Sequence, residues 1–289
     1  MFDKNYLAPQ PNSVIKLNEF STDYTGEYEK KTAKKALKKN TKSLKKIQKK
    51  FYADNRFSLL IILQAPDAAG KDGTIRHVMG GINPQGCRVH SFKKPSTKEL
   101  EHDYLWRHYK ALPERGMIEI FNRSHYENVL VSKVHPQIVL NENIPHIDTL
   151  DKVNDAFWET RYNEINTFEK HLANSGTHIL KFFLNLSKEE QKTRFKSRLY
   201  ESEKNWKFSP NDLKARKDWK KYVKAYEDML SNTNTGYAPW FVIPADKKWF
   251  SRIAVGTIIH DYMSALDLKF PKGIGKDAIE KAKLALDNE

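Results

Sequence analysis

The residues 60–74, LIILQAPDAAGKDGT, are the clearest candidate in this chain for chemistry on phosphate. A standard phosphate-binding loop reads G-x-x-x-x-G-K-[ST]. Its backbone N–H groups cradle phosphate, its lysine reaches the phosphate and its hydroxyl holds Mg²⁺. Gly70 and Lys71 match this pattern, but Ala65 stands at the first glycine and Asp72 at the hydroxyl position. The segment lies between a strand-like and a helix-like run, as such a loop requires. We therefore predict a phosphate site with altered metal binding.

A carboxylate inside a phosphate loop repels phosphate, so Asp67 needs an explanation. It can bind Mg²⁺, which prefers oxygen ligands and bridges to phosphate oxygens, or accept a proton from the attacking group. The structural alternative is a helix N-cap. Asp67, Asp72 and Thr74 are the candidates to replace the missing hydroxyl. Pro66 removes one backbone donor from the cradle.

The second candidate is IEIFNRSHYENVL, residues 118–130, in which an apolar strand ends in polar residues. Most phosphate-loop proteins carry an Asp there that assists Mg²⁺, whereas this chain has Asn122. Glu127 on the following helix is the candidate to supply the carboxylate instead. Arg123 is placed to clamp a phosphoryl group in transfer, with a surface ion pair as the alternative. Ligands of open α/β sheets bind beyond this end of the strands.

Residues 187–219 predict a helix, a basic loop and a second helix. Arg194 and Arg198 are four residues apart and share one helical face, and Lys207 lies in the loop between the helices. This arrangement is typical of the lid of a nucleotide kinase, which excludes water so that the phosphoryl group reaches its acceptor. An ordinary solvated helical hairpin is the alternative.

The elements that position these residues alternate along the chain. Apolar runs predict strands at 56–64, 87–92, 116–121, 178–185 and 239–244. Helical patterns cover 28–51, 97–111, 124–133, 151–175, 187–201, 211–231 and 247–266, a helix begins near 75, and 277–289 is a short helix or a fraying tail. Strands alternating with helices predict an α/β domain, with a parallel sheet covered by helices on both faces. Residues 1–26 are rich in turn formers and predict an extended arm.

The composition indicates a basic protein of the cytoplasm. The net charge is +14, which attracts polyanions. Eleven lysines between residues 28 and 51 give the predicted helix a cationic face, either a solvated surface or a wall beside an anionic substrate. No apolar run suits a membrane span, the first residues lack a signal peptide's apolar core, and Cys87 is the only cysteine. We therefore expect a reducing, cytoplasmic setting without a membrane partner.

Several segments together resemble one family. DAAGKDGT, NPQG, SFKKPSTKEL, HDYLWRHYKALPERG, IFNRSHYENVLVSKVHP, NWKFS and APWFVIPADKKWF occur in the order seen in the polyphosphate kinase 2 family, and the resemblance runs from about residue 15 to 270. It implies a three-layer phosphate-loop kinase fold with a five-stranded parallel sheet and a helical lid at about 187–218. The kinase domain would span 55–289, and 1–54 would form an arm and a lysine-rich helix.

The resemblance also implies an activity. Family members move the terminal phosphoryl group between inorganic polyphosphate and nucleotides, with Mg²⁺ or Mn²⁺. We expect reversible transfer to AMP and ADP, and to GMP and GDP, by a homodimer or homotetramer that does not bind nucleic acid. The alternatives are an ATP-dependent nucleoside monophosphate kinase, which the missing hydroxyl disfavours, and a nucleic-acid-binding protein, for which no fold signature is present.

The resemblance assigns roles to named positions. Expected catalytic residues are Asp67, Lys71, Arg123 and Arg194. Expected nucleotide- and phosphate-binding residues are Ala68, Ala69, Gly70, Asp72, Gly73, Thr74, Asn122 and Glu127, with Arg198 and Lys207 as lid residues for polyphosphate. The diphosphate-specific subgroup carries FDRSWYN where this chain reads FNRSHYE. The shifted carboxylate resembles the third subgroup, which uses mono- and diphosphates, and it assigns the metal to Asp67 and Glu127.

Overall fold

The computed structural model describes residues 2–289 and contains the expected parallel sheet. Its strands lie in the order β2-β3-β1-β4-β5. Their bounds are β1 Ser58–Gln64, β2 Cys87–Ser91, β3 Ile118–Asn122, β4 Thr177–Asn185 and β5 Trp240–Pro244. All four neighbouring pairs are parallel. The sequence therefore predicted every strand of this sheet to within two residues.

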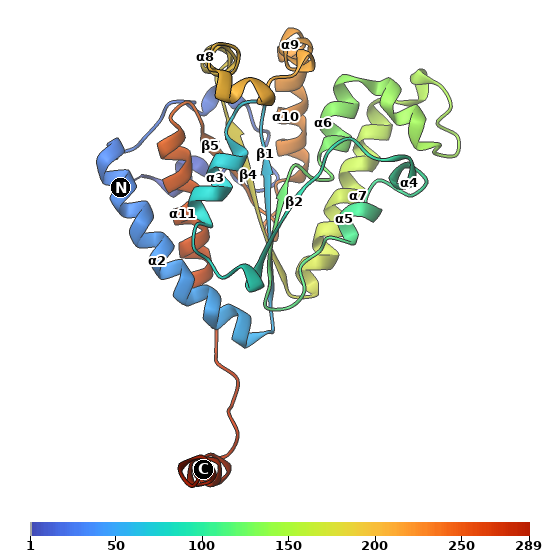
Figure 1. Ribbon diagram of the computed structural model, residues 1–289. Coiled ribbons are helices and arrows are strands. Elements are labelled where there is room, and N and C mark those ends of the chain that lie inside the picture. Colours follow the sequence, from blue (N-terminus) through green and yellow to red (C-terminus); the bar gives the residue numbers. More distant parts are fainter. Residues whose placement is uncertain (1) are drawn as a thin grey trace.

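Helices cover both faces of the sheet and make the fold three layers deep (Figure 1). One layer holds α2 (Lys30–Asp54), α3 (Lys71–Val78) and α11 (Lys248–Ser264); the other holds α6 (Glu127–Val134), α7 (Asp155–Asn174) and α10 (Trp219–Thr233). Successive strand residues point to opposite faces. Leu59 and Ile61 of β1 thus pack in the first layer's core, and Leu60 and Ile62 in the second's.

Two predicted helices are each divided in the structure. The predicted helix at 97–111 is wrong: α4 (Thr97–Leu100) and α5 (Trp106–Tyr109) are single turns. Between them the Asp103 carboxylate accepts the Leu105 N–H at 2.9 Å, a local turn that competes with helix. The helix predicted at 211–231 is α9 (Pro210–Lys217) followed by α10, with Asp218 (φ −86°, ψ 18°) between them.

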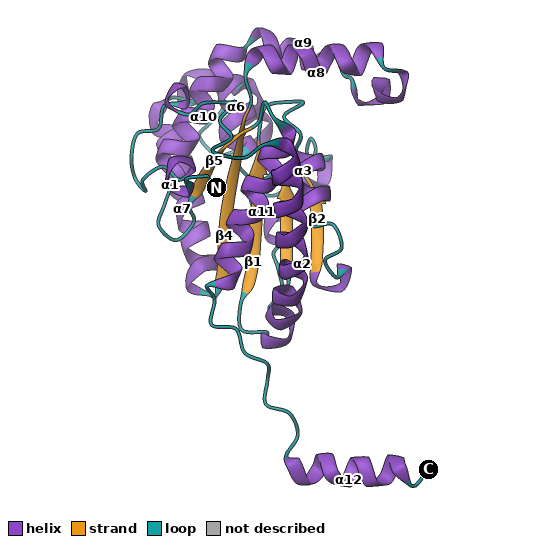
Figure 2. Cartoon of the chain, turned by 90° about the vertical axis from the view of Figure 1, so that its left-hand side faces the viewer, coloured by secondary structure: helices purple, strands orange, loops and turns teal. Residues whose placement is uncertain are grey.

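This division shapes the expected lid. It consists of α8 (Lys188–Tyr200), the 3₁₀ turn Ser202–Lys207 and α9. Arg216 of α9 donates to the Lys188 carbonyl and to Gln191 Oε1 (3.1 Å), so the two helices lie side by side across the top of the molecule (Figure 2).

The N-terminal arm is more ordered than expected. It includes α1 (Lys4–Leu7) and a 3₁₀ turn at Leu17–Glu19, and Leu7 and Ile15 are buried. Leu7 belongs to the same core as Phe51 of α2 and Leu59 of β1, so residues 2–54 add to the core of the kinase domain and form no core of their own. At the other end, α12 (Lys276–Asp287) is exposed along its whole length and projects from the base of the molecule (Figures 1 and 2).

The connectivity selects one end of the sheet for ligands. The chain passes from β1 to β2 and β3 on one side, then returns to β4 on the other side of β1. Open α/β sheets bind ligands beyond the carboxyl ends of their strands, at such a reversal. The candidate loop after β1 and the polar residues after β3 both lie there, beneath α8 and α9 (Figure 1).

Candidate functional site

The loop between β1 and α3 has the backbone geometry of a tight cradle. Gly70 has φ +103° and Ala68 has φ +64°, both in the left-handed region. Gly70 adopts this without cost, whereas Ala68 is strained there. Gly70 precedes α3, whose N-terminal N–H groups favour an anion. A Cβ at Gly73 would lie 3.5 Å from Arg252 Nη2, so Arg252 of α11 packs against the loop.

Thr74 was a candidate to replace the missing hydroxyl of the loop. Its side chain is buried and lines a small apolar hollow with Ile61 and Ile120 beneath α3. Its burial does not support Thr74 as the replacement for the missing hydroxyl, and the roles of Thr74, Asp67 and Asp72 stay predictions. Ala69 is buried as well and contributes through its backbone.

Lys71 lies folded over the loop, and its Nζ donates to the Ala65 carbonyl at 3.1 Å. Burial and the nearby Arg123 charge lower the pKa of Lys71. The carboxylates of Asp67, Glu127 and Asp72 oppose this lowering, so all three are close enough to the ammonium to act on it. One lysine thus sits among three acids, where a phosphate would compete for its charge.

Asp67 and Arg123 form an ion pair across the site. Arg123 Nη2 donates to Asp67 Oδ1 at 3.1 Å, and both side chains are partly exposed. Arg123 has φ +64°, and its N–H donates to the Leu63 carbonyl of β1 at 3.1 Å. This strained backbone directs the guanidinium toward the loop. The structure thus brings the loop carboxylate and the arginine after β3 into contact.

Asn122 at the end of β3 contacts the altered loop position directly. Its Nδ2 donates to Asp72 Oδ1 at 2.7 Å, while its Oδ1 is buried without a hydrogen-bond partner. Buried acceptors are usually paired with protein, water or an ion. The unpaired amide oxygen therefore faces a position suited to a donor or a cation.

Glu127 begins α6, where a carboxylate favours the helix dipole. Burial raises the pKa of Glu127, and the charges of Arg123 and Lys71 oppose the rise. The Gln64 amide lies between Glu127 and Ser124. In the orientation that satisfies both, its nitrogen donates to Glu127 Oε1 at 2.9 Å and its oxygen accepts from Ser124 Oγ at 3.1 Å. Glu127 is thus held in place from β1.

A buried ion pair supports the turn that leads into α6. Lys181 of β4 donates to Glu169 of α7 at 2.6 Å and to the Tyr126 hydroxyl at 2.8 Å, and all three side chains are fully buried. Tyr126 also donates to Glu169 at 2.7 Å. Because Tyr126 directly precedes Glu127, this network fixes where α6 begins.

A cavity of about 100 Å³ opens beside these charges. Asp67, Arg123 and Glu127 line one side. Opposite them stand Trp219, Tyr222 and Tyr226 of α10, with Leu17 of the N-terminal arm and Gln191 of α8. Sequence reasoning missed these residues, although the aromatic stripe at three- and four-residue spacing on α10 was the available signal. The cavity combines a charged end with an aromatic wall, which suits a nucleotide.

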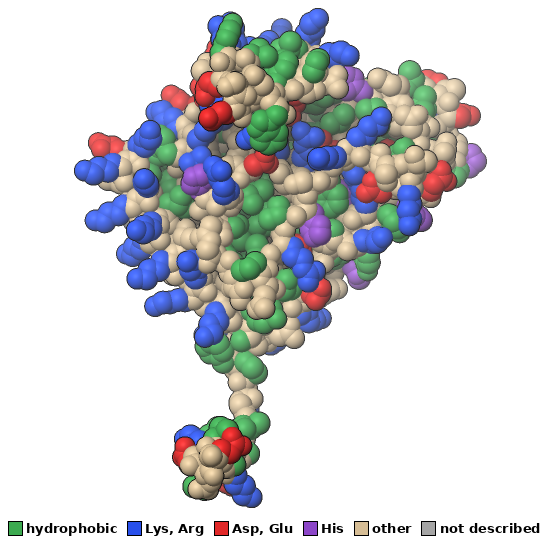
Figure 3. Space-filling view, viewed as in Figure 1, with side chains coloured by type: hydrophobic (Ala, Val, Ile, Leu, Met, Phe, Trp, Pro, Cys, Tyr) green, Lys and Arg blue, Asp and Glu red, His purple; other side chains and the backbone are tan. Residues whose placement is uncertain are grey.

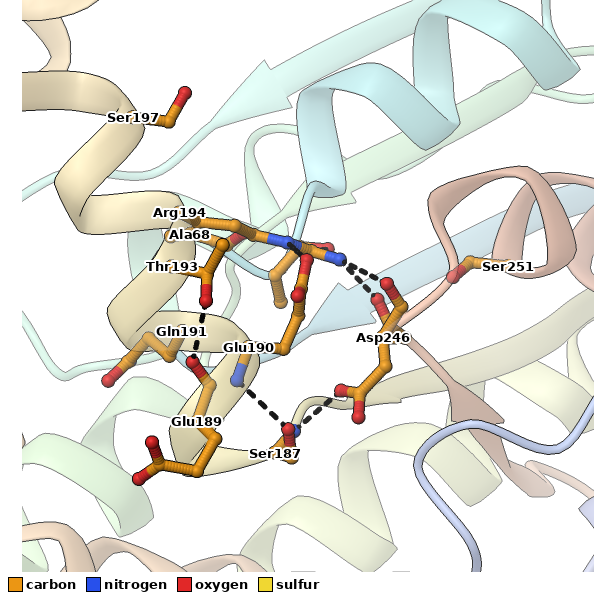
Figure 4. A network of polar contacts seen from close by, with 12 residues as sticks. Ala68, Ser187, Glu189, Glu190, Gln191, Thr193, Arg194, Ser197, Asp246 and Ser251 are labelled. Carbon is orange, nitrogen blue, oxygen red and sulfur yellow. Dashed lines mark hydrogen bonds and ion pairs between the residues drawn. The ribbon is translucent and has the colours of Figure 1, made fainter. Parts of the chain in front are cut away.

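Arg194 does not occupy the position expected of a catalytic lid arginine (Figure 4). It is 5% exposed. Nη1 donates to the carbonyls of Ala68 (3.0 Å) and Ala69 (2.8 Å). Nη2 donates to those of Ala245 (2.6 Å) and Asp246 (3.0 Å).

Nε of Arg194 donates to Glu190 at 2.8 Å. All five guanidinium donors are then engaged, and none is left for a phosphate. Arg194 is a positioning residue here: it ties α8 to the loop and to the end of β5. Asp246 also accepts the Ser187 N–H at 2.8 Å, which fixes the start of α8.

Arg198 and Lys207 lie higher in the lid and do not line the cavity. Arg198 Nη1 donates to the Lys207 carbonyl at 3.1 Å and to Asp212 at 3.0 Å, which holds the lid together internally. Lys207 is exposed, and its Nζ lies 4.9 Å from the centre of the Trp206 ring. Their expected contact with polyphosphate stays a prediction.

The residues present fit a magnesium ion. Among residues 2–289, no group of three His, Cys, Asp or Glu side chains forms a complete metal cage. Mg²⁺ does not need one, because it is usually bound by one or two carboxylates together with substrate phosphates and water. Asp67 and Glu127 share the cavity wall and offer only oxygen, and Asn122 Oδ1 is unpaired nearby.

Comparisons with known proteins identify the family of this chain. A model of the polyphosphate kinase 2 family matches residues 27–271. The ADP-polyphosphate phosphotransferase of Rhodopseudomonas palustris is 50% identical over 236 residues, which is 82% of this chain and 81% of that protein. The AMP/ADP-polyphosphate phosphotransferase of Meiothermus ruber is 43% identical over 265 residues, or 91% of this chain and 94% of that one.

The structural comparison gives the same result. The crystal structure of polyphosphate kinase 2 from Arthrobacter aurescens TC1 superimposes with a TM-score of 0.87 at 38% identity, over 97% of this chain and 95% of that one. Within the described residues, no helix is both long and apolar enough to cross a membrane. From the loop, the sheet topology and these matches together, the chain belongs to the polyphosphate kinase 2 family.

Proposed function

We propose that this protein transfers the terminal phosphoryl group of inorganic polyphosphate to AMP and ADP, reversibly and with Mg²⁺. Family membership supports the reaction class. The observation that carries the proposal is the shared cavity wall of Asp67, Arg123 and Glu127, next to Lys71 and opposite an aromatic surface. Charged side chains beside an aromatic wall support phosphoryl transfer to a nucleotide.

The chain's own residues account for the phosphoryl step. Lys71 and Arg123 offer positive charge where the equatorial oxygens of a transferring phosphoryl group would develop negative charge. Asp67 orients Arg123 through their ion pair. When bound, Mg²⁺ would be held by Asp67 and Glu127 and would neutralise phosphate charge. Among residues 2–289 no histidine lines the cavity, so we propose direct transfer from donor to acceptor.

The acceptor range is the finer part of the proposal. The two relatives differ in the acceptors that their names state: ADP in one, AMP and ADP in the other. Glu127 supports the wider range, because its carboxylate stands at the charged end of the cavity, where the shorter phosphate of AMP leaves room for a metal ligand. Use of GMP and GDP, assembly into a homodimer or homotetramer, and location in the cytoplasm stay predictions.

The test is an assay of both acceptors. The purified protein is incubated with polyphosphate and Mg²⁺, with AMP or ADP, and nucleotides are separated by chromatography. ADP and ATP formed from AMP, and ATP from ADP, are the expected result. ATP from ADP alone would retain the activity and remove the role of Glu127. Phosphorylation of AMP by ATP at a comparable rate without polyphosphate would favour an ordinary monophosphate kinase, and no product would contradict the proposal.

A further inference from the structure

One side of α2 carries a row of lysines. Lys31, Lys34, Lys38, Lys42, Lys45 and Lys49 recur at spacings of three and four residues, so they form one stripe along the helix. All six are exposed. Among residues 2–289 none of them forms a hydrogen bond or ion pair through its side chain. Figure 3 shows blue side chains along the edge of the molecule that α2 occupies.

The packing of α2 fixes where this stripe points. The helix runs parallel to α11: Asn40 donates to Thr257 at 2.8 Å, and Ser43 contacts His260 at 2.9 Å. A Cβ at Gly81 would lie 2.6 Å from Lys45 Cε, so the Lys45 stem lies against the segment that follows α3. At Lys45 the stripe therefore lies beside the segment that follows α3. At 1.5 Å per residue it is about 27 Å long from Lys31 to Lys49.

Three further cations lie on the helices that share a layer with α2. Arg76 on α3 and Lys248 and Arg252 on α11 have no hydrogen bond or ion pair among the described residues. Arg252 Nη2 lies against Gly73 of the loop. Burial and the nearby Arg76 charge lower the pKa of Arg252, which shows that two like charges are held close together. Cations thus continue from the loop toward α2.

Such an array is unfavourable without an anion, because neighbouring like charges repel one another. Two kinds of polyanion fit it poorly. The apolar side of α2, including Ala33, Leu44 and Phe51, is buried in the core and has nothing to insert into a membrane. No aromatic residue interrupts the stripe, whereas single-stranded nucleic acid is held by stacking on aromatic side chains. A linear chain of phosphates needs charge alone.

We propose that the cations of α3, α11 and the α2 stripe form a distal track for long polyphosphate. This inference rests on the proposed function. The track holds the part of the donor that extends away from the reacting phosphoryl group. It acts on affinity for long donors and does not touch the atoms that react. The track therefore distinguishes short donors from long ones. A donor of a few phosphates ends before the stripe, whereas a donor of hundreds of phosphates covers it.

The test compares two triple variants with the same loss of charge. The first variant replaces Lys34, Lys38 and Lys45 with glutamine and so removes three charges from the stripe. The second variant replaces Lys272, Lys276 and Lys281 with glutamine. It removes three exposed charges from the C-terminal segment and α12, far from the loop (Figure 1). Glutamine is a good helix former, so both variants should fold. Initial rates with ADP are measured with tripolyphosphate and with chains of several hundred phosphates, over a range of KCl.

The stripe variant should raise KM for the long donor about tenfold and leave kcat and KM for tripolyphosphate unchanged. Its slope of log KM against log salt should fall by about two, as expected for the loss of three phosphate contacts. The α12 variant should behave as the parent. Equal effects of both variants, or equal effects on both donors, would overturn the track, as would preferential binding of RNA over polyphosphate. Absence of transfer from any donor by the parent would instead contradict the proposed function.

Discussion

Asn122 donates to Asp72 at 2.7 Å, so the carboxylate and its partner have exchanged places relative to a standard phosphate loop. In the standard arrangement the loop carries a hydroxyl and the strand carries an Asp, and both serve Mg²⁺. Here the loop carries the acid and the strand carries the amide. The site keeps one carboxylate and one neutral donor, and the two positions that depart from the motif are in direct contact.

The pair predicts how the two positions tolerate substitution. Asn122→Asp places two carboxylates in contact and removes the donor, so kcat should fall about 100-fold. Combining it with Asp72→Ser restores a hydroxyl and an acid, and should recover about tenfold of that loss. Rates with ADP and polyphosphate are measured for both single variants and for the double variant. Together they give the coupling free energy between the two positions. A double variant no better than Asn122→Asp would show that the positions act independently.

Removing either central charge should stop transfer while the fold remains. Lys71→Ala and Asp67→Ala are expected to lower kcat by about 10² to 10³. Lys71 offers positive charge at the reacting group, whereas Asp67 orients Arg123 and would hold Mg²⁺. Lys98→Ala, an exposed lysine on α4, is the matched control and should retain full activity. Thermal unfolding verifies that the variants are folded. Substantial activity in either loop variant would remove that residue from the mechanism.

Glu127 should set the acceptor range. Glu127→Asn should weaken use of AMP more than use of ADP, by about tenfold in the ratio of kcat/KM, which corresponds to about 1.4 kcal/mol. Burial raises the pKa of Glu127, so the carboxylate becomes protonated sooner as the pH falls. Activity with AMP should therefore decline on the acid side, and Glu127→Gln should lose this dependence. Equal losses with the two acceptors would contradict the role.

Arg194 should affect stability as well as rate. Arg194→Lys keeps the charge but cannot reach four carbonyls at once, and each buried acceptor left unpaired costs about 1 to 3 kcal/mol. The variant should therefore unfold at a lower temperature and have a reduced kcat, whereas Arg198→Lys should change both little. If Arg194→Lys lowered the rate at an unchanged unfolding temperature, direct contact with phosphate would be the better explanation.

A buried acid on β3, next to the edge strand β2, predicts a pH effect on stability. Burial raises the pKa of Glu119 to about 7, although Arg88 opposes this. His90 Nε2 lies 3.0 Å from its carboxylate. Because the folded state binds the proton more tightly, the contribution of neutral Glu119 is lost as the pH rises through 7.

In Glu119→Gln the side chain stays neutral at every pH, so this loss of stability does not occur. The unfolding temperature of the variant minus that of the parent should therefore be larger at about pH 8 than at about pH 5.5. Thermal unfolding across this range measures the difference. Glu114→Gln, which changes an exposed neighbour bound to the same arginine, should show no such trend. A constant difference between Glu119→Gln and the parent would mean that Glu119 does not titrate in this range.

The sequence predicted most of what local pattern determines. Apolar runs identified every strand because a strand buried on both faces is continuously hydrophobic. The spacing of Gly70 and Lys71 placed the loop, and the polar end of β3 placed Arg123. Since parallel strands end at one edge of the sheet, Asp67 and Arg123 were both expected at the ligand-binding end, but their ion pair was not predicted.

What the sequence could not predict depends on contacts between distant segments. The five donors of Arg194 are satisfied by residues 68, 69, 190, 245 and 246, which no local pattern relates. The break between α4 and α5 depends on one Asp103 turn that outweighs helix propensity. The aromatic wall on α10 was visible as a helical stripe, but its direction was fixed only once α10 packed against α6.

The placement of α12 has a consequence for handling this enzyme. The helix leaves the base of the molecule, whereas the loop, the cavity and the lid lie at the opposite end (Figure 1). Its side chains contribute nothing to the buried core. A solid support attached there would hold the molecule with its reactive end toward the solution. The C-terminal helix is thus a natural anchor for an immobilised catalyst that recycles nucleotides from an inexpensive phosphate polymer.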